Sequence, residues 1–507
     1  MHPSLHSRVT PHKPAAIMAD GSTLDYAGLE AASNRGAHLL RSLGLKRGDG
    51  IALMLHNSLQ VFELVWAAQR AGLYYTCIST HLTDPEVAYI VADSDSRLLV
   101  SSMPVSDALA GAIPGVAVFA PGYRNFVAER APFPVTAIAD ESPGNDMLYS
   151  SGTTGRPKGI RPALPEGPLD QSNGLTDFGI SHYGMNADTV FLSPAPLYHA
   201  APLRWCMSVQ KLGGTVIVMD KYDPEDALAL IEKHRVTHAQ FVPTHFVRML
   251  KLPEEGRQAY DHSSLKVAFH AAAPCAVEVK QAMMAWWGPV LHEFYAGTEA
   301  NGLTAIGPQE WLERPGSVGR AVWGSIRICD EEGNVLPPAK VGAIYFADGP
   351  AFSYHNDPEK TAGSRNRHGW TTLGDVGRVD EDGYLYLTDR QSFMIISGGV
   401  NIYPQEVENA LVTHPKVADA AVVGAPHAEM GEQVVAVVEP VDWSEAGDAL
   451  AEELRQWLEG RISRVKMPRR FEFDPQLPRT PSGKLMKRLV RERFWPKAGA
   501  EKVAGDA

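Results

Sequence analysis

The stretch MLYSSGTTGRPKG, from Met147 to Gly159, combines three glycines with four Ser or Thr hydroxyls and two cations. Glycine adopts positive φ at little steric cost, so the backbone N–H groups of such a turn can converge on an anion. Further hydrogen-bond donors are the side chains of Ser150, Ser151, Thr153, Thr154 and Lys158. The stretch predicts a phosphate-binding loop, and a plain surface loop rich in glycine and serine is the alternative interpretation.

A comparison with the P-loop of nucleoside triphosphatases narrows the class of loop. That motif reads G-x-x-x-x-G-K-[ST], with a glycine directly before the lysine and a hydroxyl directly after it. Here Lys158 is followed by Gly159, and Gly155 stands three residues before the lysine. The sequence therefore disfavours a P-loop enzyme.

Composition limits the remaining classes of protein. With 507 residues and 44% hydrophobic content, the chain can bury a large core and form two or more domains. The net charge of -12 argues against general nucleic-acid binding, which needs clustered cations. Neither a signal peptide nor an uncharged apolar run of about 18 residues occurs, so we expect a soluble cytoplasmic protein. Cys77, Cys206, Cys275 and Cys329 are widely spaced, and we expect reduced thiols rather than a disulfide frame or zinc site.

Short apolar segments alternate with longer amphipathic ones in the first two thirds of the chain. GIALML (50–55) precedes SLQVFELVWAAQRAG (58–72), and THAQFV (237–242) precedes PTHFVRMLKL (243–252). This alternation predicts an α/β fold with parallel, helix-covered sheets. From about Ser325, short strands separated by turn signals predict an antiparallel, β-barrel-like subdomain.

A new unit is expected to begin after Arg390. SFMIIS (392–397), a probable helix over 404–414, two strand-like segments and a helix from about 447 to 462 indicate a small α+β domain. The polar end of the chain is expected to be flexible. We therefore predict a large N-terminal domain over 1–390, a hinge at 391–392, a C-terminal domain over 393–495 and a tail over 496–507.

Five motifs in one order make a family resemblance specific. After the opening loop come YAGTE (295–299), TTLGDVGRVDEDGYLYLTDR (371–390), GGVNIYPQEVE (398–408) and PRTPSGKLMKR (478–488). Together they resemble the adenylate-forming superfamily, in particular its acyl-CoA synthetases for fatty or aryl acids. The resemblance covers nearly the whole chain, and agreement across independent motifs makes a chance match improbable.

The resemblance implies an ATP-dependent carboxylate–CoA ligase. A carboxylate is a poor electrophile, and adenylation supplies AMP as a leaving group while pyrophosphate departs. Transfer of the acyl group to the CoA thiol then releases AMP. Such an enzyme positions two anions and offsets their charge.

Catalytic roles follow from the resemblance, residue by residue. Lys484 matches the lysine that bridges the attacking carboxylate and the α-phosphate. Thr298 matches a phosphate-contacting hydroxyl, and Glu299 the carboxylate that places Mg²⁺ on the phosphates. His199, in PLYHAAP, matches an aromatic position at the acyl pocket.

The resemblance also implies a nucleotide site with more residues than the catalytic set. Asp375 matches the aspartate that accepts both ribose hydroxyls, Arg390 a neighbouring phosphate or ribose contact, and Tyr295 the residue against the adenine face. The full set of implied ATP contacts is Ser150, Ser151, Gly152, Thr153, Thr154, Gly155, Lys158, Ala272, Ala273, Pro274, Glu293, Phe294, Tyr295, Ala296, Gly297, Thr298, Asp375, Arg390 and Lys484.

In the family the C-terminal domain serves twice, and rotates between the two half-reactions. Gly398 and Gly399 match the loop that lines the channel for the acceptor thiol. Relatives usually carry Asp or Lys at the pivot, whereas this chain has Ser392. A serine can absorb the change of backbone dihedrals, but it removes any salt bridge at the pivot.

Several alternatives remain open at this point. An amide bond synthetase shares the first step but hands the acyl group to an amine, and a luciferase-like oxygenase or a non-catalytic nucleotide-binding regulator shares the fold. The loop IRPALPEGPLDQSNG (160–174) departs from the Thr-His pair of many relatives and leaves the acid open. Phe178, Leu197, Trp205, Phe241 and Leu303 hint at a hydrophobic acid, and we expect a monomer or homodimer.

Overall fold

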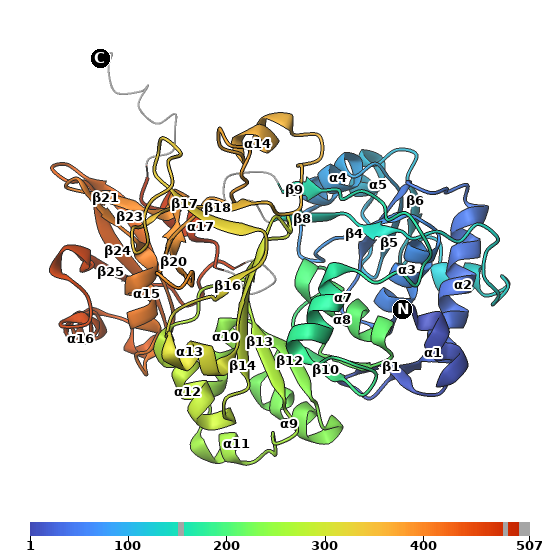
Figure 1. Cartoon of the computed structure of the whole chain (residues 1–507), viewed down its shortest axis with the longest axis horizontal. Helices are drawn as coiled ribbons and strands as arrows, with labels where there is room; N and C mark the ends of the chain where they lie inside the picture. The colour runs from blue at the N-terminus through green and yellow to red at the C-terminus, as the bar shows by residue number, and fades with distance from the viewer. Residues whose placement is uncertain (151–156, 480–484, 496–507) are drawn as a thin grey trace.

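A computed structural model describes residues 1–150, 157–479 and 485–495. Figure 1 places the N-terminal five-stranded sheet on the right, a nine-stranded sheet below and the C-terminal unit on the left. A four-stranded antiparallel sheet lies above, between the large sheets and the C-terminal unit. Within the described ranges, no helix is both long and apolar enough to cross a membrane.

The nine-stranded sheet has a parallel centre and antiparallel edges. Its order is β16-β15-β14-β13-β12-β10-β11-β1-β2, and only β2, β15 and β16 run antiparallel to their neighbours. The strands are β1 Pro14–Met18, β2 Thr23–Asp25, β10 Val190–Ser193, β11 Thr215–Val218, β12 His238–Phe241, β13 Val267–His270, β14 Leu291–Ala296, β15 Leu303–Ile306 and β16 Arg320–Trp323. The associated helices are α7 Gly174–Tyr183, α8 Ala200–Leu212, α9 Pro224–His234, α10 Pro243–Leu250, α11 Glu254–Gln258, α12 Val277–Trp287 and α13 Pro308–Glu313.

The five-stranded sheet is parallel throughout, in the order β6-β5-β3-β4-β7. Its strands are β3 Gly50–Met54, β4 Tyr74–Cys77, β5 Ser96–Ser101, β6 Ala117–Phe119 and β7 Asn145–Asp146. Its helices, with the one that opens the chain, are α1 Pro3–Val9, α2 Tyr26–Ser42, α3 Leu59–Arg70, α4 Asp84–Asp93, α5 Asp107–Ala112 and α6 Phe126–Arg130. Both quoted strand–helix pairs of the sequence are confirmed, as β3 with α3 and β12 with α10.

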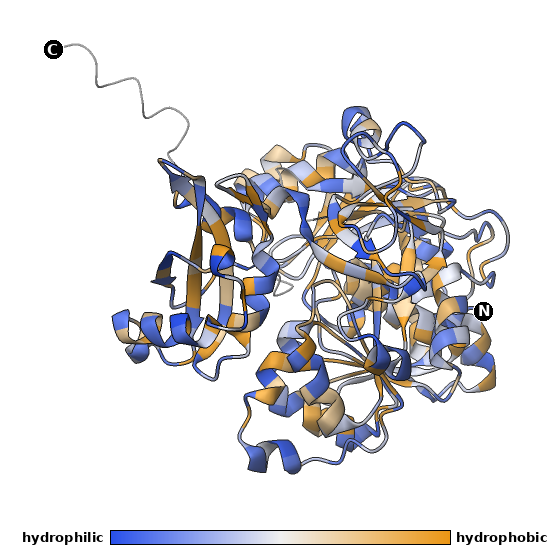
Figure 2. Ribbon diagram, turned by 60° about the vertical axis from the view of Figure 1, so that its left-hand side comes forward, coloured by the Kyte–Doolittle hydropathy of each residue, from blue (hydrophilic) through white to orange (hydrophobic). Residues whose placement is uncertain are grey.

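Alternating residues of the nine-stranded sheet feed two separate cores. Phe191 packs into one apolar cluster and the next residue, Leu192, into the other; Val216 and Ile217 divide in the same way. Successive side chains of a strand point to opposite faces, so a sheet covered on both faces needs nearly continuous apolar strands. Figure 2 shows this pattern, with hydrophobic strands inside and hydrophilic colour on outward helix faces.

The antiparallel region and the C-terminal unit follow the sequence-based prediction. The first holds β17 Ser325–Cys329, β18 Gly342–Ala347, β19 Asp375–Val379 and β20 Leu385–Arg390, with α14 Pro358–Gly363. A 3₁₀ turn, η1 Gln391–Phe393, leads into the C-terminal unit. That unit comprises β21 Ile395–Ser397, β22 Val400–Ile402, β23 Val417–His427, β24 Gly431–Pro440, β25 Arg470–Phe473, α15 Pro404–Val412, α16 Asp448–Leu458 and α17 Lys487–Glu492. The hinge at 391–392 and the domain limits stay predictions.

Gly319 lies where the antiparallel sheet pairs with the nine-stranded one, and its backbone lies close to β15 of the nine-stranded sheet. Its φ is 93°, and the backbones of Gly319 and Leu385 pair across the two sheets. A Cβ at Gly319 would lie 1.9 Å from the carbonyl oxygen of Ala305. The close approach therefore needs a residue without a side chain.

We expect Gly319→Ala to lower the free energy of unfolding by about 3 kcal/mol, since left-handed strain adds to a backbone clash. Gly369→Ala is the matched control, because its φ is 77° and a Cβ there would have nothing within 4 Å. It should cost only about 1 kcal/mol. Urea denaturation followed by tryptophan fluorescence measures both, and equal losses would contradict the need for glycine beside Ala305.

Candidate functional site

The predicted phosphate loop is held at its base by a short hairpin. β8 Leu148–Ser150 pairs with β9 Lys158–Ile160, and Ser150 faces Lys158 in the register. Ser151, Gly152, Thr153, Thr154 and Gly155 lie outside the described residues. The hairpin therefore holds Ser150 and Lys158, on the two sides of that segment, opposite each other.

Asp375, the residue predicted for the ribose, contacts Tyr295, predicted for the adenine face, and Arg390, predicted for the ribose or phosphate. The Tyr295 hydroxyl donates to Oδ2 of Asp375 at 2.6 Å, and Nε of Arg390 lies 3.1 Å from Oδ1 of the same carboxylate. Asp375 opens β19 and Arg390 closes β20, and the two residues face each other in the register. Burial and then the Asp375 charge raise the pKa of Tyr295 well above its usual range, so the phenol stays protonated. Each carboxylate oxygen keeps a lone pair for a further donor.

Tyr354 connects Glu299 with Lys158. Its hydroxyl donates to Oε1 of Glu299 at 2.9 Å, and Nζ of Lys158 lies 4.9 Å from its ring centroid. Burial, followed by the charge of Lys360, lowers the pKa of Lys158. The carboxylate predicted for Mg²⁺ and the cation predicted for phosphate are thus neighbours. Sequence analysis missed Tyr354, because its segment, FSYHND, carries no motif.

Arg204 is a second residue that the sequence analysis missed. Its Nε and Nη2 lie 2.6 Å and 3.1 Å from the two carboxylate oxygens of Asp146, and its Nη1 donates to the Thr298 carbonyl at 3.4 Å. A planar guanidinium fits a carboxylate in this two-bonded way. Arg204 therefore ties the Thr298–Glu299 turn to the residue that precedes the phosphate loop. His199 is the N-cap of the same helix, α8, with its ring 4.5 Å from that of Tyr198.

The segment predicted for adenine contains backbone strain. Ala272 has φ 75° and Ala300 has φ 53°, both in the left-handed region that residues with a Cβ rarely adopt. Ala272 lies with Ala273 and Pro274 directly after β13, and Ala300 directly follows Glu299. Strained positions of this kind cluster at binding sites, where the surrounding structure holds them.

Two of the predicted nucleotide contacts turn their side chains inward. Glu293 accepts from Nζ of Lys280 at 2.7 Å, and Nε2 of His270 lies 3.4 Å from the same oxygen. Burial, with Lys280 second, holds the pKa of His270 well below its usual range, so the ring is neutral. Phe294 belongs to the main apolar core. Any contact of these two residues with a nucleotide would come from their backbone, as would those of Ala296 and Gly297 on the same stretch.

The residues that hint at a hydrophobic acid are core residues. All five are at most 2% exposed, and Phe241 belongs to a different apolar cluster from the other four. They do not converge on one pocket. The apolar character of these five residues therefore gives no information about which acid the protein binds.

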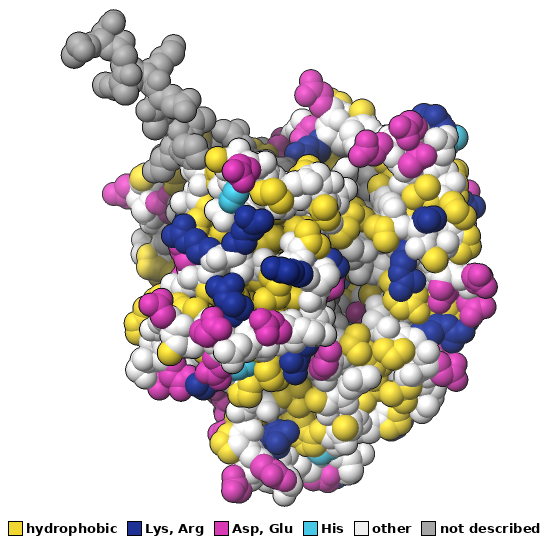
Figure 3. All heavy atoms as spheres, turned by 90° about the vertical axis from the view of Figure 1, so that its left-hand side faces the viewer, with side chains coloured by type: hydrophobic (Ala, Val, Ile, Leu, Met, Phe, Trp, Pro, Cys, Tyr) yellow, Lys and Arg dark blue, Asp and Glu magenta, His cyan; other side chains and the backbone are white. Residues whose placement is uncertain are grey.

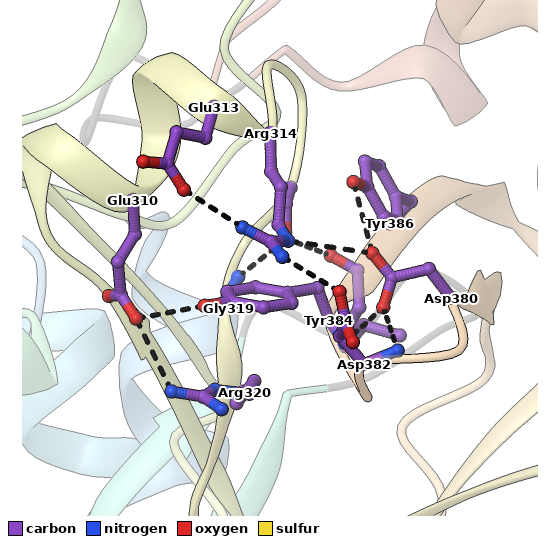
Figure 4. Close-up of polar contacts among 11 residues, drawn as sticks. Glu310, Glu313, Arg314, Gly319, Arg320, Asp380, Asp382, Tyr384 and Tyr386 are labelled. Carbon is purple, nitrogen blue, oxygen red and sulfur yellow. Dashed lines mark hydrogen bonds and ion pairs between the residues drawn. The ribbon is translucent and has the colours of Figure 1, made fainter.

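The β19–β20 hairpin is clamped at the end remote from Asp375. Figure 4 shows the ring of Tyr384 beside Arg314 and Arg320, whose guanidinium carbons lie 4.2 Å and 4.8 Å from its centroid. The Tyr384 hydroxyl donates to Glu310 at 2.9 Å, and Arg314 pairs with Asp382 at 2.7 Å. These contacts tie the hairpin turn to α13 and so fix the strand that carries Asp375.

The C-terminal unit presents the remaining predicted residues apart from this cluster. Gly398 and Gly399, with φ 57° and 78°, form the exposed tip between β21 and β22, and Ser392 is exposed in η1. Lys484 lies outside the described residues. On its two sides, Arg479 and Leu485 form an antiparallel bridge.

A buried ion pair anchors the helix that follows Lys484. Nζ of Lys487 lies 2.8 Å from Oε2 of Glu408, and both side chains are less than 10% exposed. Burial raises the pKa of Glu408 to about 7, against the opposing charge of Lys487. A lone charge there would be costly, so each residue holds the other in place.

Comparison with known proteins gives matches over nearly the whole chain. The family model for AMP-binding enzymes matches residues 5–352, and that for the AMP-binding enzyme C-terminal domain matches 406–484. A fatty acid–acyl-carrier-protein ligase from Streptomyces coeruleorubidus is 33% identical, covering 97% of this chain and 95% of the relative. A feruloyl-CoA synthase from an Amycolatopsis species is 34% identical, covering 97% and 98%.

Solved structures of other proteins also match nearly the whole chain. ATP-bound MatB from Rhodopseudomonas palustris, at 30% identity, gives a TM-score of 0.81, and apo MatB gives 0.72, each covering 97% of this chain and 99% of that chain. The amide bond synthetase McbA from Marinactinospora thermotolerans, at 28% identity and the same coverage, gives 0.80.

Asp375→Asn tests the ribose site. We expect it to weaken ATP binding roughly tenfold, because a neutral amide replaces a charged acceptor. The variant should also lose discrimination between ATP and 2′-deoxy-ATP, which isothermal titration calorimetry measures for both nucleotides. An unchanged preference for ATP in a stably folded variant would contradict the assignment.

Proposed function

The chain belongs to the AMP-binding enzyme family, as an AMP-forming ligase of the acyl-CoA synthetase type, and we propose that it activates a hydrophobic carboxylic acid at the site around Asp375 and Glu299. One observation carries the proposal. The contacts of Asp375 with Tyr295 and Arg390, and those of Tyr354 with Glu299 and Lys158, meet at the end of β14, which holds Tyr295 and is followed by Glu299. An ionised acceptor pair for ribose beside a cation and a carboxylate for metal-bound phosphates fits ATP.

Adenylation needs charge stabilisation more than proton transfer. The acid is ionised at neutral pH and attacks as it stands, so no general base is required and His199 is assigned to the acyl pocket. Lys158 and the donors of the phosphate loop hold the departing phosphates. Lys484 acts at the α-phosphate, where the new bond forms and negative charge gathers.

Mg²⁺ fits beside Glu299. Oε1 of Glu299 accepts from Tyr354, which fixes the carboxylate and leaves Oε2 for a ligand. One carboxylate completed by phosphate oxygens and water is the usual way proteins hold Mg²⁺ on a nucleotide. Arg204, through the Thr298 carbonyl, holds the same turn. When bound, the ion neutralises charge on the departing phosphates.

The C-terminal hairpin is the proposed entry for the acceptor thiol. The tip of this hairpin is linked to Arg469 through two residues. A Cβ at Gly398 would lie 2.4 Å from Cε of Met430. The backbone N–H of Met430 donates to the His427 ring, whose other nitrogen is hydrogen-bonded to Arg469. Arg469 belongs to the stretch 461–470, which holds five cations and no carboxylate. Figure 3 shows a group of Lys and Arg side chains on this face of the C-terminal unit. CoA carries phosphates, which Lys and Arg side chains bind. The cations beside the hairpin therefore favour CoA as the acceptor.

An amide bond synthetase is the second candidate, favoured by the fold match to McbA over nearly the whole chain. The two functions share acyl-adenylate formation and differ in the acceptor alone. The names of the relatives favour aliphatic or aryl acids for this chain, since they act on fatty and feruloyl groups.

The function is tested by measuring pyrophosphate release over a panel of aliphatic and aryl acids. Each acid is supplied with CoA, with an amine, with a carrier protein or with no acceptor. We expect pyrophosphate with at least one hydrophobic acid, and acyl-CoA only when CoA is present. Pyrophosphate followed by amide and no thioester would overturn the CoA assignment. Absence of pyrophosphate with every acid would overturn adenylation itself.

Lys484→Ala separates the half-reactions. We expect adenylation to fall at least about a hundredfold, because the cation that stabilises the transition state is lost. Conversion of a supplied acyl-adenylate to thioester should change less than about threefold. Quenched-flow assays measure each step, and equal losses in both would refute the assignment of Lys484 to adenylation.

A further inference from the structure

Lys251 of the large domain contacts the C-terminal unit directly. It is the C-cap residue of α10, and its ammonium donates to the backbone carbonyl of Val417, the first residue of β23. The two residues are 166 positions apart in the chain. The contact therefore attaches the start of β23 to the large domain.

The position of Lys251 follows from the helix that it ends. Pro243, Phe246 and Met249 are buried at the spacing of one helix face, so α10 is anchored in the second core. Lys251 lies beyond that face, with an exposed stem and its ammonium covered by the C-terminal unit. This covering lowers the pKa of Lys251 to about 8, against the opposing charges of Asp419 and Glu439.

The acidic residues near Lys251 lead to the segment that carries Lys484. Arg479 bonds to Asp419 and lies 3.8 Å from Glu439, which also accepts from the Leu477 N–H at 2.9 Å. Arg479 is the last described residue before Lys484, and its bridge to Leu485 closes the base of that segment. A continuous set of contacts thus runs from α10 to this base.

Among the described residues, α15 makes further contacts between the domains. The Gln405 N–H at the start of α15 donates to Asp389 at 2.9 Å, and Val412 packs at the edge of the second core. These contacts hold α15, whereas Lys251 holds the start of β23. Two separated attachments define an orientation, and one would leave a rotation free.

The match to MatB differs between its two structures. At equal identity and coverage, the TM-score is 0.81 for the ATP-bound structure and 0.72 for the apo structure. This chain therefore has the arrangement closer to the ATP-bound one.

We propose that Lys251 is a positioning residue for adenylation: its bond to Val417, beside the Asp419–Arg479 pair, holds the C-terminal unit in the orientation that adenylation uses, through Arg479, the last described residue before Lys484. The inference rests on the proposed function. Lys251 touches no reacting atom and acts through β23 and Arg479. Its contribution is specific to the half-reaction that uses this orientation.

Lys251→Met tests the proposal, since it keeps an apolar stem and removes the donor. We expect acid-dependent pyrophosphate release to slow roughly tenfold, while thioester formation from supplied acyl-adenylate stays within about twofold. Lys251→Arg retains donors and should restore adenylation to within about threefold of the unmodified chain. Lys266→Met, an exposed lysine before β13 in the same domain, is the matched control and should change neither step.

Asp419→Asn provides a second variant, because it weakens the pair with Arg479 and leaves the Lys251 donor and the Val417 carbonyl in place. Combined with Lys251→Met, it should cost less than the product of the single effects, since both act on one set of contacts. Equal loss of both half-reactions, no loss of either, or failure of arginine to restore adenylation would overturn the proposal. If the unmodified chain itself releases no pyrophosphate, the proposed function fails instead.

Discussion

The carboxylate of Asp375 is the interaction on which the arrangement of the site depends. Tyr295, from the nine-stranded sheet, holds one oxygen, and Arg390, the last residue before the hinge turn, holds the other. Three parts of the chain therefore meet at one side chain. Asp375 and Arg390 are the start and the end of the β19–β20 hairpin. A shift of the four-stranded sheet would therefore move the predicted ribose site and the start of the C-terminal unit together.

The rest of the large domain keeps this point rigid. The backbone of Gly319 pairs with Leu385 of the hairpin, and the Arg314–Tyr384–Arg320 stack fixes the far end of the hairpin. The C-terminal unit is attached differently, through a short turn and a small number of polar contacts that include Lys251. Polar contacts of this kind give way more easily than a packed apolar core, so a rigid site beside an adjustable domain is the physical outcome.

Much of the fold was predictable because periodicity is a local property. The alternation of strands and helices, the antiparallel region from Ser325 and the helix over 404–414 are all confirmed. Pocket composition was not predictable in this way. Phe178 and Phe241 look alike in sequence yet pack into different cores, because the face of the sheet that each segment covers depends on tertiary topology.

The sequence by itself determined the chemical class, because its motifs, in one order over nearly the whole chain, are those of a single enzyme family. Tertiary structure alone decided which residues support them. Tyr354, Arg204 and Lys251 stand in segments without a motif, and each acts through a partner more than 50 positions away. Their roles depend on distance in space, which no local pattern of residues encodes. The same holds for Glu293, whose buried carboxylate accepts from Lys280 of α12.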